Sequence, residues 1–379
     1  MRETYHHLIF DNAAHMTQVA DHSIDLVVTS PPYPMIQMWD DLFGTIDPAI
    51  KMALSTGDAD DAFEKMHGLL DLVWEQLHRV VKPGGMVCIN IGDAVRSVAE
   101  EFRLFPNHVR IVAALQSLGF TQLPSVLWRK PTNAPNKFMG SGMLPPSAYV
   151  TLEHEYILIF RRSGKRPFAS PQEKQERRES AYFWEERNTW FSDVWFNLIG
   201  ATQQLKNGAS RERSAAFPLE IPYRLINMFS LKGDTVLDPF LGTGTTMLAA
   251  MATARHSVGI EIDPAFQMLI MQKAVALPQI ANNIIEQRLK SHSDFIQARR
   301  QAAGEIKNFN RPYNLPVITR QEEALFFDPV AHIQFIGDDR FKVVYGAAEA
   351  NLPIADLSLT PGQDLHLKSK SKGHQLKLF

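Results

Sequence analysis

The sequence contains one cysteine, no long hydrophobic run and almost no net charge. The single cysteine, Cys88, excludes disulfide bonds and a cysteine-based zinc site, and it is compatible with a reducing compartment. No apolar run reaches the roughly 18 residues that a membrane-spanning helix needs, and residues 1–10 lack the charged-then-apolar layout of a signal peptide. The isolated histidines His6, His7, His15 and His22 show no ligand spacing, and no metal site is expected. These absences predict a soluble, cytoplasmic protein.

The near-neutral charge limits where a polyanion could bind. With a formal net charge of −2 at pH 7, no overall field attracts nucleic acid, so a surface for such a partner must be a local patch. The 379 residues, of which 45% are hydrophobic and 21% charged, are enough to bury a sizeable core. This length predicts two domains, or one large domain with insertions.

A short apolar run that ends at two prolines is the first candidate functional segment. Residues 24–29 (IDLVVT) predict a buried strand, which Pro31 and Pro32 prevent from continuing with ladder hydrogen bonds. Each proline also fixes its own φ and holds the residue before it extended. The hydroxyl of Ser30, free backbone carbonyls and the ring of Tyr33 suit the recognition of an amino group on a planar base. Taken alone, the segment is equally compatible with a rigid turn.

A glycine-rich turn follows another predicted strand about two hundred residues downstream. Residues 235–246 (TVLDPFLGTGTT) predict a strand that ends at Asp238, a turn and the start of a helix. Glu261 follows at the end of the next predicted strand, at the spacing where an acidic side chain receives ribose hydroxyls. This layout holds a nucleoside cofactor at the C-terminal edge of a parallel sheet. The cofactor-binding residues expected here are Asp238, Pro239, Phe240, Gly242, Gly244, Thr245 and Glu261.

The details of this turn favour one cofactor over the common alternatives. No lysine follows the glycines, which excludes a phosphate-binding P-loop, and Met247 stands where a dinucleotide motif has its third glycine. A carboxylate and a ring directly before the glycines, at Asp238 and Phe240, suit a cationic ligand that carries adenine. S-adenosylmethionine has both properties. A dinucleotide-dependent oxidoreductase and an ordinary tight turn remain as alternatives.

Taken together, TSPPY and FLGTGTT resemble the motifs of the S-adenosylmethionine-dependent DNA amino-methyltransferases. The catalytic motif precedes the cofactor motif, which is similar to the order in the permuted beta group of that family. The resemblance covers roughly residues 5–275. Further segments that resemble family landmarks are Asp11 near the cofactor adenine, Lys82–Gly85, Glu153–His154–Glu155, and residues 214–230, which contain Phe217 and would close over the methionine end of the cofactor.

The resemblance implies the chemistry. The target base would be flipped out of the duplex, with its amino group held by Ser30 and the Pro31 carbonyl and its ring stacked on Tyr33. The amine would attack the methyl group directly, without a covalent enzyme intermediate. Methylation at carbon 5 of cytosine is excluded, because it requires a cysteine nucleophile and Cys88 lies inside a predicted strand. The residues expected to act on the base are Ser30, Pro31, Pro32 and Tyr33, and Thr29 is added to the cofactor set.

The identity of the target amine rests on one residue. Family members that act on N4 of cytosine usually have serine where this chain has Ser30, whereas those that act on N6 of adenine usually have Asp or Asn. The sequence therefore favours N4-cytosine, with N6-adenine as the alternative. An inactive nucleic-acid-binding regulator on the same fold is a further alternative. The expected partners are double-stranded DNA and, where one exists, a restriction endonuclease that acts on the same site.

The expected fold is α/β: a Rossmann-like methyltransferase fold with a mostly parallel seven-stranded sheet, helices on both faces, a circularly permuted motif order and a target-recognition insert. Apolar positions at three- and four-residue spacing predict a helix over residues 63–81, whereas the composition of residues 35–61 predicts a loop. The expected domains are a catalytic half (1–160), the insert (161–213), a cofactor-binding half (214–303) and a C-terminal extension of unknown role (304–379).

The insert combines basic and aromatic residues, which is typical of a surface that contacts DNA. The side chains expected to bind DNA are Arg161, Arg162, Lys165, Arg166, Arg177 and Arg178. The aromatic residues expected to wedge or stack are Phe168, Tyr182, Phe183, Trp184, Trp190 and Trp195. Five glutamates between positions 173 and 186 leave a solvated charged helix open as an alternative.

Overall fold

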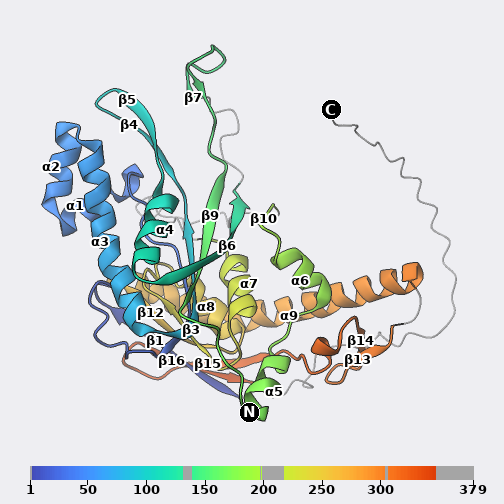
Figure 1. Cartoon of the computed structure of the whole chain (residues 1–379). Helices are drawn as coiled ribbons and strands as arrows, with labels where there is room; N and C mark the ends of the chain where they lie inside the picture. The colour runs from blue at the N-terminus through green and yellow to red at the C-terminus, as the bar shows by residue number, and fades with distance from the viewer. Residues whose placement is uncertain (1, 131–138, 197, 199–216, 304–305, 347–379) are drawn as a thin grey trace.

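The computed structural model describes residues 2–130, 139–196, 198, 217–303 and 306–346. Within these residues, ten strands form one central sheet (Figure 1). In sheet order they are β10 (Val194–Trp195), β6 (Phe120–Arg129), β9 (His154–Arg162), β3 (Val81–Ile91), β2 (Ile24–Thr29), β11 (Thr235–Asp238), β12 (His256–Glu261), β1 (Glu3–Phe10), β16 (Arg340–Tyr345) and β15 (Val330–Phe335).

The predicted sheet lies at the centre of the observed one. Strands β3, β2, β11, β12 and β1 are parallel neighbours, and β9 lies antiparallel between β3 and β6. This is the predicted mostly parallel α/β sheet, but it is wider than seven strands. Strand β10 adds to one edge, while β16 and β15 add antiparallel to the other through β1. Strands β15 and β16 come from the C-terminal residues, for which the sequence predicts no strand.

Alternate residues of the central strands enter two different hydrophobic cores. In β2, Leu26 and Val28 belong to one core and Val27 to the other, as expected for successive side chains on opposite faces of a strand. The first core is covered by α7 (Glu220–Phe229), α8 (Thr245–Ala252) and α9 (Gln267–Ala303). The second is covered by α3 (Ala59–Val80) and α4 (Asn107–Ser117). The helices therefore cover both faces of the sheet, as predicted (Figure 1).

Helix α3 confirms the clearest helical pattern in the sequence. Its apolar stripe is buried, including Met66, Leu70 and Leu77, which are no more than 2% exposed. The side chain of Asp58 accepts a hydrogen bond from the backbone of Asp61 and so caps the first turn. The helix begins four residues earlier than the predicted range because this cap lies outside the apolar stripe.

The prediction of a loop over residues 35–61 is wrong. The segment folds as α1 (Asp40–Ile46) and α2 (Pro48–Thr56), ahead of α3. Asp47 accepts from the backbone of Ala49, Pro48 occupies the first turn, and Gly57 ends the helix with φ +81°. The sequence contains these helix start and stop signals, but the helices between them are too short to show a clear apolar stripe.

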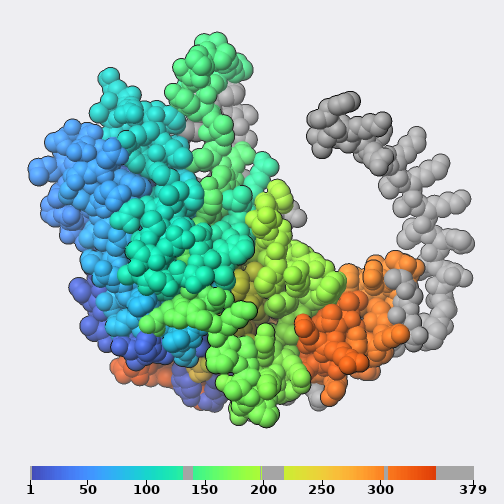
Figure 2. Space-filling model, viewed as in Figure 1, coloured from blue at the N-terminus to red at the C-terminus, as the bar shows by residue number. Residues whose placement is uncertain are grey.

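Two hairpins extend beyond the sheet at one end. They are β4–β5 (Ala94–Val98 and Glu101–Phe105) and β7–β8 (Met139–Gly140 and Ala148–Tyr149). The rings of Phe102 and Tyr149 stack with centroids 4.8 Å apart and so join the two hairpins. In the space-filling view both stand out from the rounded body (Figure 2).

The remaining elements lie mainly at the opposite end and along α9. They are α5 (Pro171–Glu179), α6 (Trp184–Trp190), β13 (Asn308–Asn310) and β14 (Leu315–Val317), with 3-10 turns at Gln37–Trp39, Pro264–Phe266 and Arg320–Glu322. None of the helices in the described ranges has the length and apolarity of a membrane span.

Candidate active site

The two motifs meet at one edge of the sheet. Strand β11 pairs with β2 in parallel, with Leu237 opposite Val27, so the residues after both strands leave the sheet side by side. Strand β12 lies on the other side of β11 and ends at Glu261, which pairs with Phe10 at the end of β1. The carboxyl ends of four adjacent parallel strands therefore gather the predicted functional residues. Such an edge is where open α/β sheets bind ligands.

A hydrogen bond joins the proline segment to the glycine turn. The hydroxyl of Thr29 donates to Oδ1 of Asp238 at 2.6 Å, across 209 residues of sequence. The same oxygen accepts the backbone N–H of Phe240 at 3.0 Å. Asp238 is 3% exposed, and this burial raises the pKa of its carboxyl from 3.8 to about 6. A buried carboxyl thus lies at the junction of the two motifs.

The glycine turn is held in place by Glu261. Gly242 and Gly244 have φ of +52° and +83°, a conformation that side chains with a Cβ rarely adopt. Oε2 of Glu261 accepts the N–H of Gly242 at 2.7 Å, and Oε1 accepts the N–H of Asp263 at 2.9 Å. Burial raises the pKa of Glu261. The carboxylate therefore fixes the turn and keeps lone pairs for a ligand.

The residues present fit the expected cofactor. A Cβ built on Gly242 meets no heavy atom within 4 Å, so the turn faces open space beside Asp238 and Glu261. Asp11 lies next to Glu261, whose carbonyl accepts its N–H at 3.1 Å. The open glycine turn therefore lies beside the carboxyls of Asp238 and Glu261, with Asp11 just after the neighbouring strand β1. Acidic groups in this arrangement suit the hydroxyls and the cationic end of S-adenosylmethionine. When bound, this cofactor supplies a methyl group on a positively charged sulfur.

The other residues predicted for the cofactor are placed differently. Pro239 is buried behind the turn, and the ring of Phe240 is half-buried, 6.2 Å from that of Trp74. Thr245 is half-buried in the first turn of α8. Phe217 is 7% exposed and belongs to the hydrophobic core on the α7 face of the sheet.

The segment Ser30–Tyr33, called the SPPY segment below, is fixed by contacts of its serine and tyrosine. Oγ of Ser30 lies 3.2 Å from the hydroxyl of Tyr33, which donates to Oε2 of Glu155 at 3.0 Å. Gly92 packs against the ring, since a Cβ there would lie 3.1 Å from Cε2 of Tyr33. Burial raises the pKa of Tyr33 well above its usual value. Pro31 is buried and Pro32 half-buried.

Three polar residues at this site were not predicted as functional. Nδ2 of Asn90 donates to the hydroxyl oxygen of Tyr33 at 2.8 Å and to Oε2 of Glu155 at 2.7 Å. Nζ of Lys130 donates to Oε1 of Glu155 at 2.7 Å. Asn90 is the polar residue in the otherwise apolar run of residues 86–91 (MVCINI), which was the available signal. Glu155 was recognised only as a family landmark.

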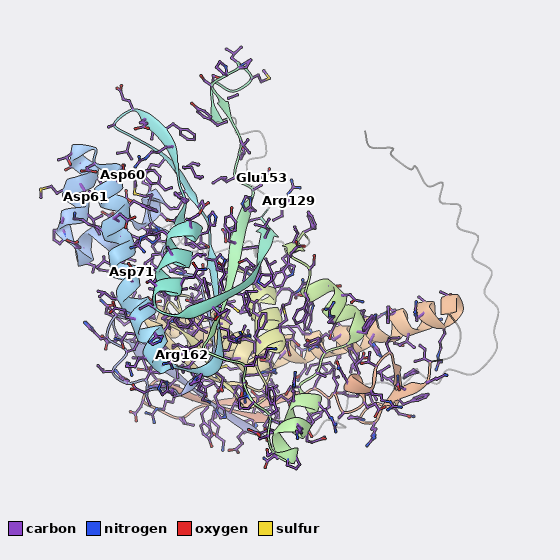
Figure 3. All side chains as sticks on the ribbon, viewed as in Figure 1. Asp60, Asp61, Asp71, Arg129, Glu153 and Arg162 are labelled. Atoms are coloured by element: carbon purple, nitrogen blue, oxygen red, sulfur yellow. The ribbon has the colours of Figure 1, made fainter. Side chains whose placement is uncertain are left out.

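The predicted DNA contacts of Arg162 and Arg166 need correction. The guanidinium of Arg162 is buried against the carbonyl of Val81, at the start of β3. The guanidinium of Arg166 binds both carboxylate oxygens of Asp234, just before β11, at 2.6 and 3.0 Å. Both arginines thus lie at the amino ends of the parallel strands, opposite the site. In Figure 3, Arg162 is far from Arg129 and Glu153, which lie toward the hairpins.

The remaining basic residues of that group share this location. Arg161 lies one residue before the end of the antiparallel strand β9, and the backbone of Lys165 packs on Gly84. Arg177 and Arg178 belong to α5, which lies beside the N-terminus (Figure 1). Because these side chains lie at the far end of the sheet, they do not line the edge where a base would enter.

Three of the six aromatic residues expected to wedge or stack are buried inside the protein. Phe183, Trp190 and Trp195 are no more than 6% exposed, and Phe183 stacks on His292 with centroids 3.8 Å apart. Trp184 is 41% exposed. The expectation that this set wedges into DNA is therefore wrong for the three buried rings, whose burial stabilises the core. Positions 197 and 199–213 of the predicted insert lie outside the described residues.

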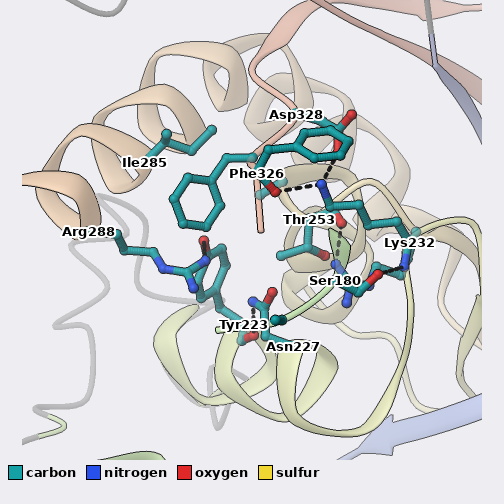
Figure 4. A pocket seen from close by; sticks show the side chains of 13 residues that line it. Ser180, Tyr223, Asn227, Lys232, Thr253, Ile285, Arg288, Phe326 and Asp328 are labelled. Carbon is teal, nitrogen blue, oxygen red and sulfur yellow. Dashed lines mark hydrogen bonds and ion pairs between the residues drawn. The ribbon is translucent and has the colours of Figure 1, made fainter. Parts of the chain in front are cut away.

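A separate small cavity lies between α7, α9 and residues 326–328 (Figure 4). Its volume is about 20 Å³, enough for about one water molecule and too small for a nucleoside. Nζ of Lys232 pairs with Asp328 at 2.7 Å and donates to the carbonyl of Phe326 at 2.6 Å. Burial lowers the pKa of Lys232 to about 8. This cavity lies beside a buried ion pair that connects Lys232, just before β11, with Asp328, just before β15.

Known proteins resemble the chain over most of its length. A family model described as DNA methylase (N6_N4_Mtase) matches residues 24–272. The Type II methyltransferase M.MthZI of Methanothermobacter thermautotrophicus is 49% identical over 324 residues, 85% of this chain and 90% of that protein. The Type II methyltransferase M.MjaI of Methanocaldococcus jannaschii is 49% identical over 281 residues, 71% and 91% of the two chains.

A solved structure supports both the fold and the cofactor. The TTHA0409 protein of Thermus thermophilus, in complex with S-adenosyl-L-methionine, is 29% identical and superposes with a TM-score of 0.55. The match covers 71% of this chain and 94% of that one. The family model spans more than half of the chain, and the glycine turn fits the same cofactor. The chain therefore belongs to the N6/N4 DNA methylase family and is an S-adenosylmethionine-dependent DNA amino-methyltransferase.

Proposed function

We propose that this enzyme methylates the N4 amino group of cytosine at a specific site in duplex DNA. The observation that carries the proposal is the position of Ser30. The residue directly before it, Thr29, is hydrogen-bonded to Asp238 of the cofactor turn at 2.6 Å. An amine held at Ser30 therefore lies near the edge where the methyl group is bound. Serine at this position is typical of family members that act on cytosine N4.

The chain's own residues position the base. The target cytosine leaves the duplex, because its amino group cannot reach a pocket at a sheet edge while it is stacked and paired. The Ser30 hydroxyl and the Pro31 carbonyl accept hydrogen bonds from the amino group, and the ring of Tyr33 stacks on the base. These acceptors localise the nitrogen lone pair that conjugation otherwise spreads into the ring. The contribution of the protein is then positioning and electrostatic preorganisation.

The cofactor is placed by the neighbouring strand ends. We assign the ribose hydroxyls to Glu261, the adenine to the vicinity of Asp11 and Phe240, and the cationic end to the region of Asp238. Phe217 remains our proposal for the residue that covers the methionine end, since it lies just before α7. Support for the assignment comes from the open turn at Gly242 and from the two buried carboxyls beside it.

We propose that DNA lies across the edge that carries the SPPY segment. A duplex is too wide to enter a pocket at strand ends, so it must lie on the rim, where the hairpins β4–β5 and β7–β8 project. The tip of β7–β8 exposes Met143 and Leu144, which are 81% and 71% accessible. Exposed apolar side chains beside a flipped base are suited to contact unstacked bases.

The relatives suggest a biological setting. Both M.MthZI and M.MjaI are Type II methyltransferases, so we propose that this enzyme belongs to a restriction–modification system. Its partner would be an endonuclease that cuts the same DNA sequence when it is unmethylated.

Methylome sequencing of a host that expresses the chain tests the base and the site together. The expected result is N4-methylcytosine at one short recurring sequence, absent from a host that expresses the Ser30→Ala variant. N6-methyladenine at a recurring sequence would overturn the assignment to cytosine.

A further inference from the structure

The two hydroxyls of the SPPY segment and the carboxylate of Glu155 form a continuous chain of hydrogen bonds. Oγ of Ser30 lies 3.2 Å from the hydroxyl of Tyr33, and this hydroxyl lies 3.0 Å from Oε2 of Glu155. The three groups come from the end of β2 and from β9, strands that are not neighbours in the sheet. Glu155 is 8% exposed, so its carboxylate is held inside the protein.

The number of protons on each group decides which atom donates in each of these hydrogen bonds. Nδ2 of Asn90 has only protons to give, and it donates to the Tyr33 oxygen at 2.8 Å. The Tyr33 hydroxyl has one proton, which it donates to the carboxylate of Glu155. In its contact with Tyr33, Ser30 is then the donor. Asn90 makes only a longer contact with the Ser30 oxygen, at 3.4 Å, so this oxygen keeps a lone pair for an N–H group of the substrate.

Methylation of an amine creates a proton that must leave. A nitrogen–carbon bond forms, the sulfur–carbon bond breaks with its electron pair going to sulfur, and the nitrogen becomes positively charged. Neutral product requires the loss of one N–H proton. Within the described residues, Glu155 is the carboxylate linked by hydrogen bonds to the SPPY segment.

We propose that Glu155 receives this proton through Tyr33 and Ser30. The proton on the methylated nitrogen passes to the Ser30 oxygen, the Ser30 proton to Tyr33, and the Tyr33 proton to Glu155, which becomes a neutral acid. Three protons shift by one bond each and no other reactant is needed. Glu155 touches no substrate atom, so it is a positioning residue that acts through the two hydroxyls. This inference rests on the proposed function, but it holds for either target amine.

The neighbours of Glu155 fit this role. Among the described residues, the titratable groups hydrogen-bonded to it are Tyr33 and Lys130, and Asn90 donates to the same oxygen as Tyr33. The side chain of Lys130 is 44% exposed, so its ammonium connects the buried carboxylate with water. After the reaction, the proton on Glu155 can leave along this side. The pair formed by Arg129 and Glu153 lies further along the same two strands and does not contact the chain of hydroxyls.

Conservative variants test the proposal. Tyr33→Phe keeps the ring that stacks on the base and removes the hydroxyl. Glu155→Gln keeps the shape of the side chain and removes the carboxylate that would take up the proton. We expect each to lower the single-turnover rate of methyl transfer at pH 7 by about 100-fold, the low end of the range of general acid–base effects. The defect should shrink as the pH is raised to 9, because hydroxide in solvent then accepts the proton. The KM for DNA and the calorimetric affinity for S-adenosylmethionine should stay unchanged.

Glu153→Gln is the matched control, because Glu153 is a carboxylate two residues away in an exposed pair with Arg129. It should leave the rate and the pH profile unchanged, whereas Glu155→Asp should restore part of the rate that Glu155→Gln loses. Full activity of Tyr33→Phe, or a loss that is the same at pH 7 and pH 9, would overturn the proposal. Absence of methyl transfer by the wild-type protein would contradict the proposed function, and that result is visible before any variant is compared.

Discussion

The hydroxyl of Thr29 donates a 2.6 Å hydrogen bond to the carboxyl of Asp238, which has a raised pKa of about 6 because it is buried. The bond connects the strand that carries the catalytic segment to the strand that carries the cofactor turn. Two motifs that are 209 residues apart in sequence thus share one sheet edge. Placing a charge at this buried junction costs stability, and the cost should be measurable.

Asp238→Asn should stabilise the cofactor-free protein above pH 6. The folded pKa lies above the unfolded value, so the protonated form is favoured in the folded state. The stability due to Asp238 is therefore full below about pH 3.8 and is lost as the pH rises through about 6. The loss corresponds to at most about 3 kcal/mol, and asparagine keeps the acceptor oxygen for Thr29 without the charge. Urea unfolding from pH 4 to pH 8 should show a smaller decline of stability with pH for the variant than for the wild-type protein, because the variant lacks the contribution of Asp238.

The same variant should lose affinity for S-adenosylmethionine. If Asp238 faces the cationic end of the cofactor, the thermal stabilisation that the cofactor gives to the wild-type protein should largely disappear in the variant. A variant that is stabilised by the cofactor as much as the wild-type protein would contradict the role given to this carboxyl.

Arg166→Ala should destabilise the protein without weakening DNA binding. Its guanidinium pairs with Asp234, which is 7% exposed, so removing it leaves a buried carboxylate without its strongest partner. Because the arginine is itself 35% exposed, the expected loss is about 1–3 kcal/mol in urea unfolding. Arg177→Ala, in exposed α5, is the comparison variant. A fall in DNA affinity at unchanged stability would restore the original assignment of Arg166 to DNA.

These arginines show where sequence reasoning reached its limit. A basic residue beside an aromatic one has the same pattern whether it faces a phosphate or a buried carboxylate. Arg166 and Asp234 are 68 positions apart, and their pairing depends on which end of the sheet each segment reaches. The position of Ser30 was predictable, because a strand that ends at two prolines marks its own carboxyl end.

The unpredicted parts of the site have the same cause. Glu155 lies on β9, whose antiparallel direction brings its first residues, not its last, to the active edge. If β9 were assumed to run parallel to its neighbours, Glu155 at its start would be placed at the edge opposite the active site. Strands β15 and β16 were missed because they are short and join the sheet through the pairing of β16 with β1, a contact between distant segments that local patterns do not encode.

His292→Asn should remove a pH-dependent part of the stability. Both ring nitrogens of His292 lie near acceptors, Oε1 of Glu185 at 2.8 Å and the carbonyl of Pro316 at 2.9 Å. Burial alone would lower the pKa of His292, but the hydrogen bond and the charge of Glu185 raise it above 6.5. The stabilisation is therefore full below pH 6.5 and is lost as the pH rises through the folded pKa. The variant should cost on the order of 1 kcal/mol more at pH 5.5 than at pH 9 in urea unfolding.

That pH difference is the test of the protonated ring. An equal cost of His292→Asn at both values would mean that His292 stabilises the fold by packing on Phe183 alone.

Replacing Met143 and Leu144 by serine should weaken DNA binding about 10-fold, a loss of about 1.4 kcal/mol. These side chains form the exposed tip of β7–β8, whose turn is closed by the N–H of Ser141 donating to the carbonyl of Ser147 at 2.9 Å. Because the turn does not depend on the two side chains, the fold should be unaffected. Fluorescence anisotropy with a labelled duplex gives the affinity.

The matched control for the hairpin variant replaces Met52 on α2 and Val275 on α9 by serine. These side chains are 65% and 81% exposed. The control should leave DNA affinity unchanged. Equal effects of the two double variants would show that the β7–β8 tip has no special contact with DNA.

The product nucleoside tests the central claim most directly. Purified protein is incubated with S-adenosylmethionine that carries a deuterated methyl group and with duplex DNA that contains the site found by methylome sequencing. The DNA is then hydrolysed and its nucleosides are separated by mass spectrometry. The account predicts label in N4-methylcytosine, abolished by Ser30→Ala. Label in N6-methyladenine, or in no nucleoside at all, would contradict it.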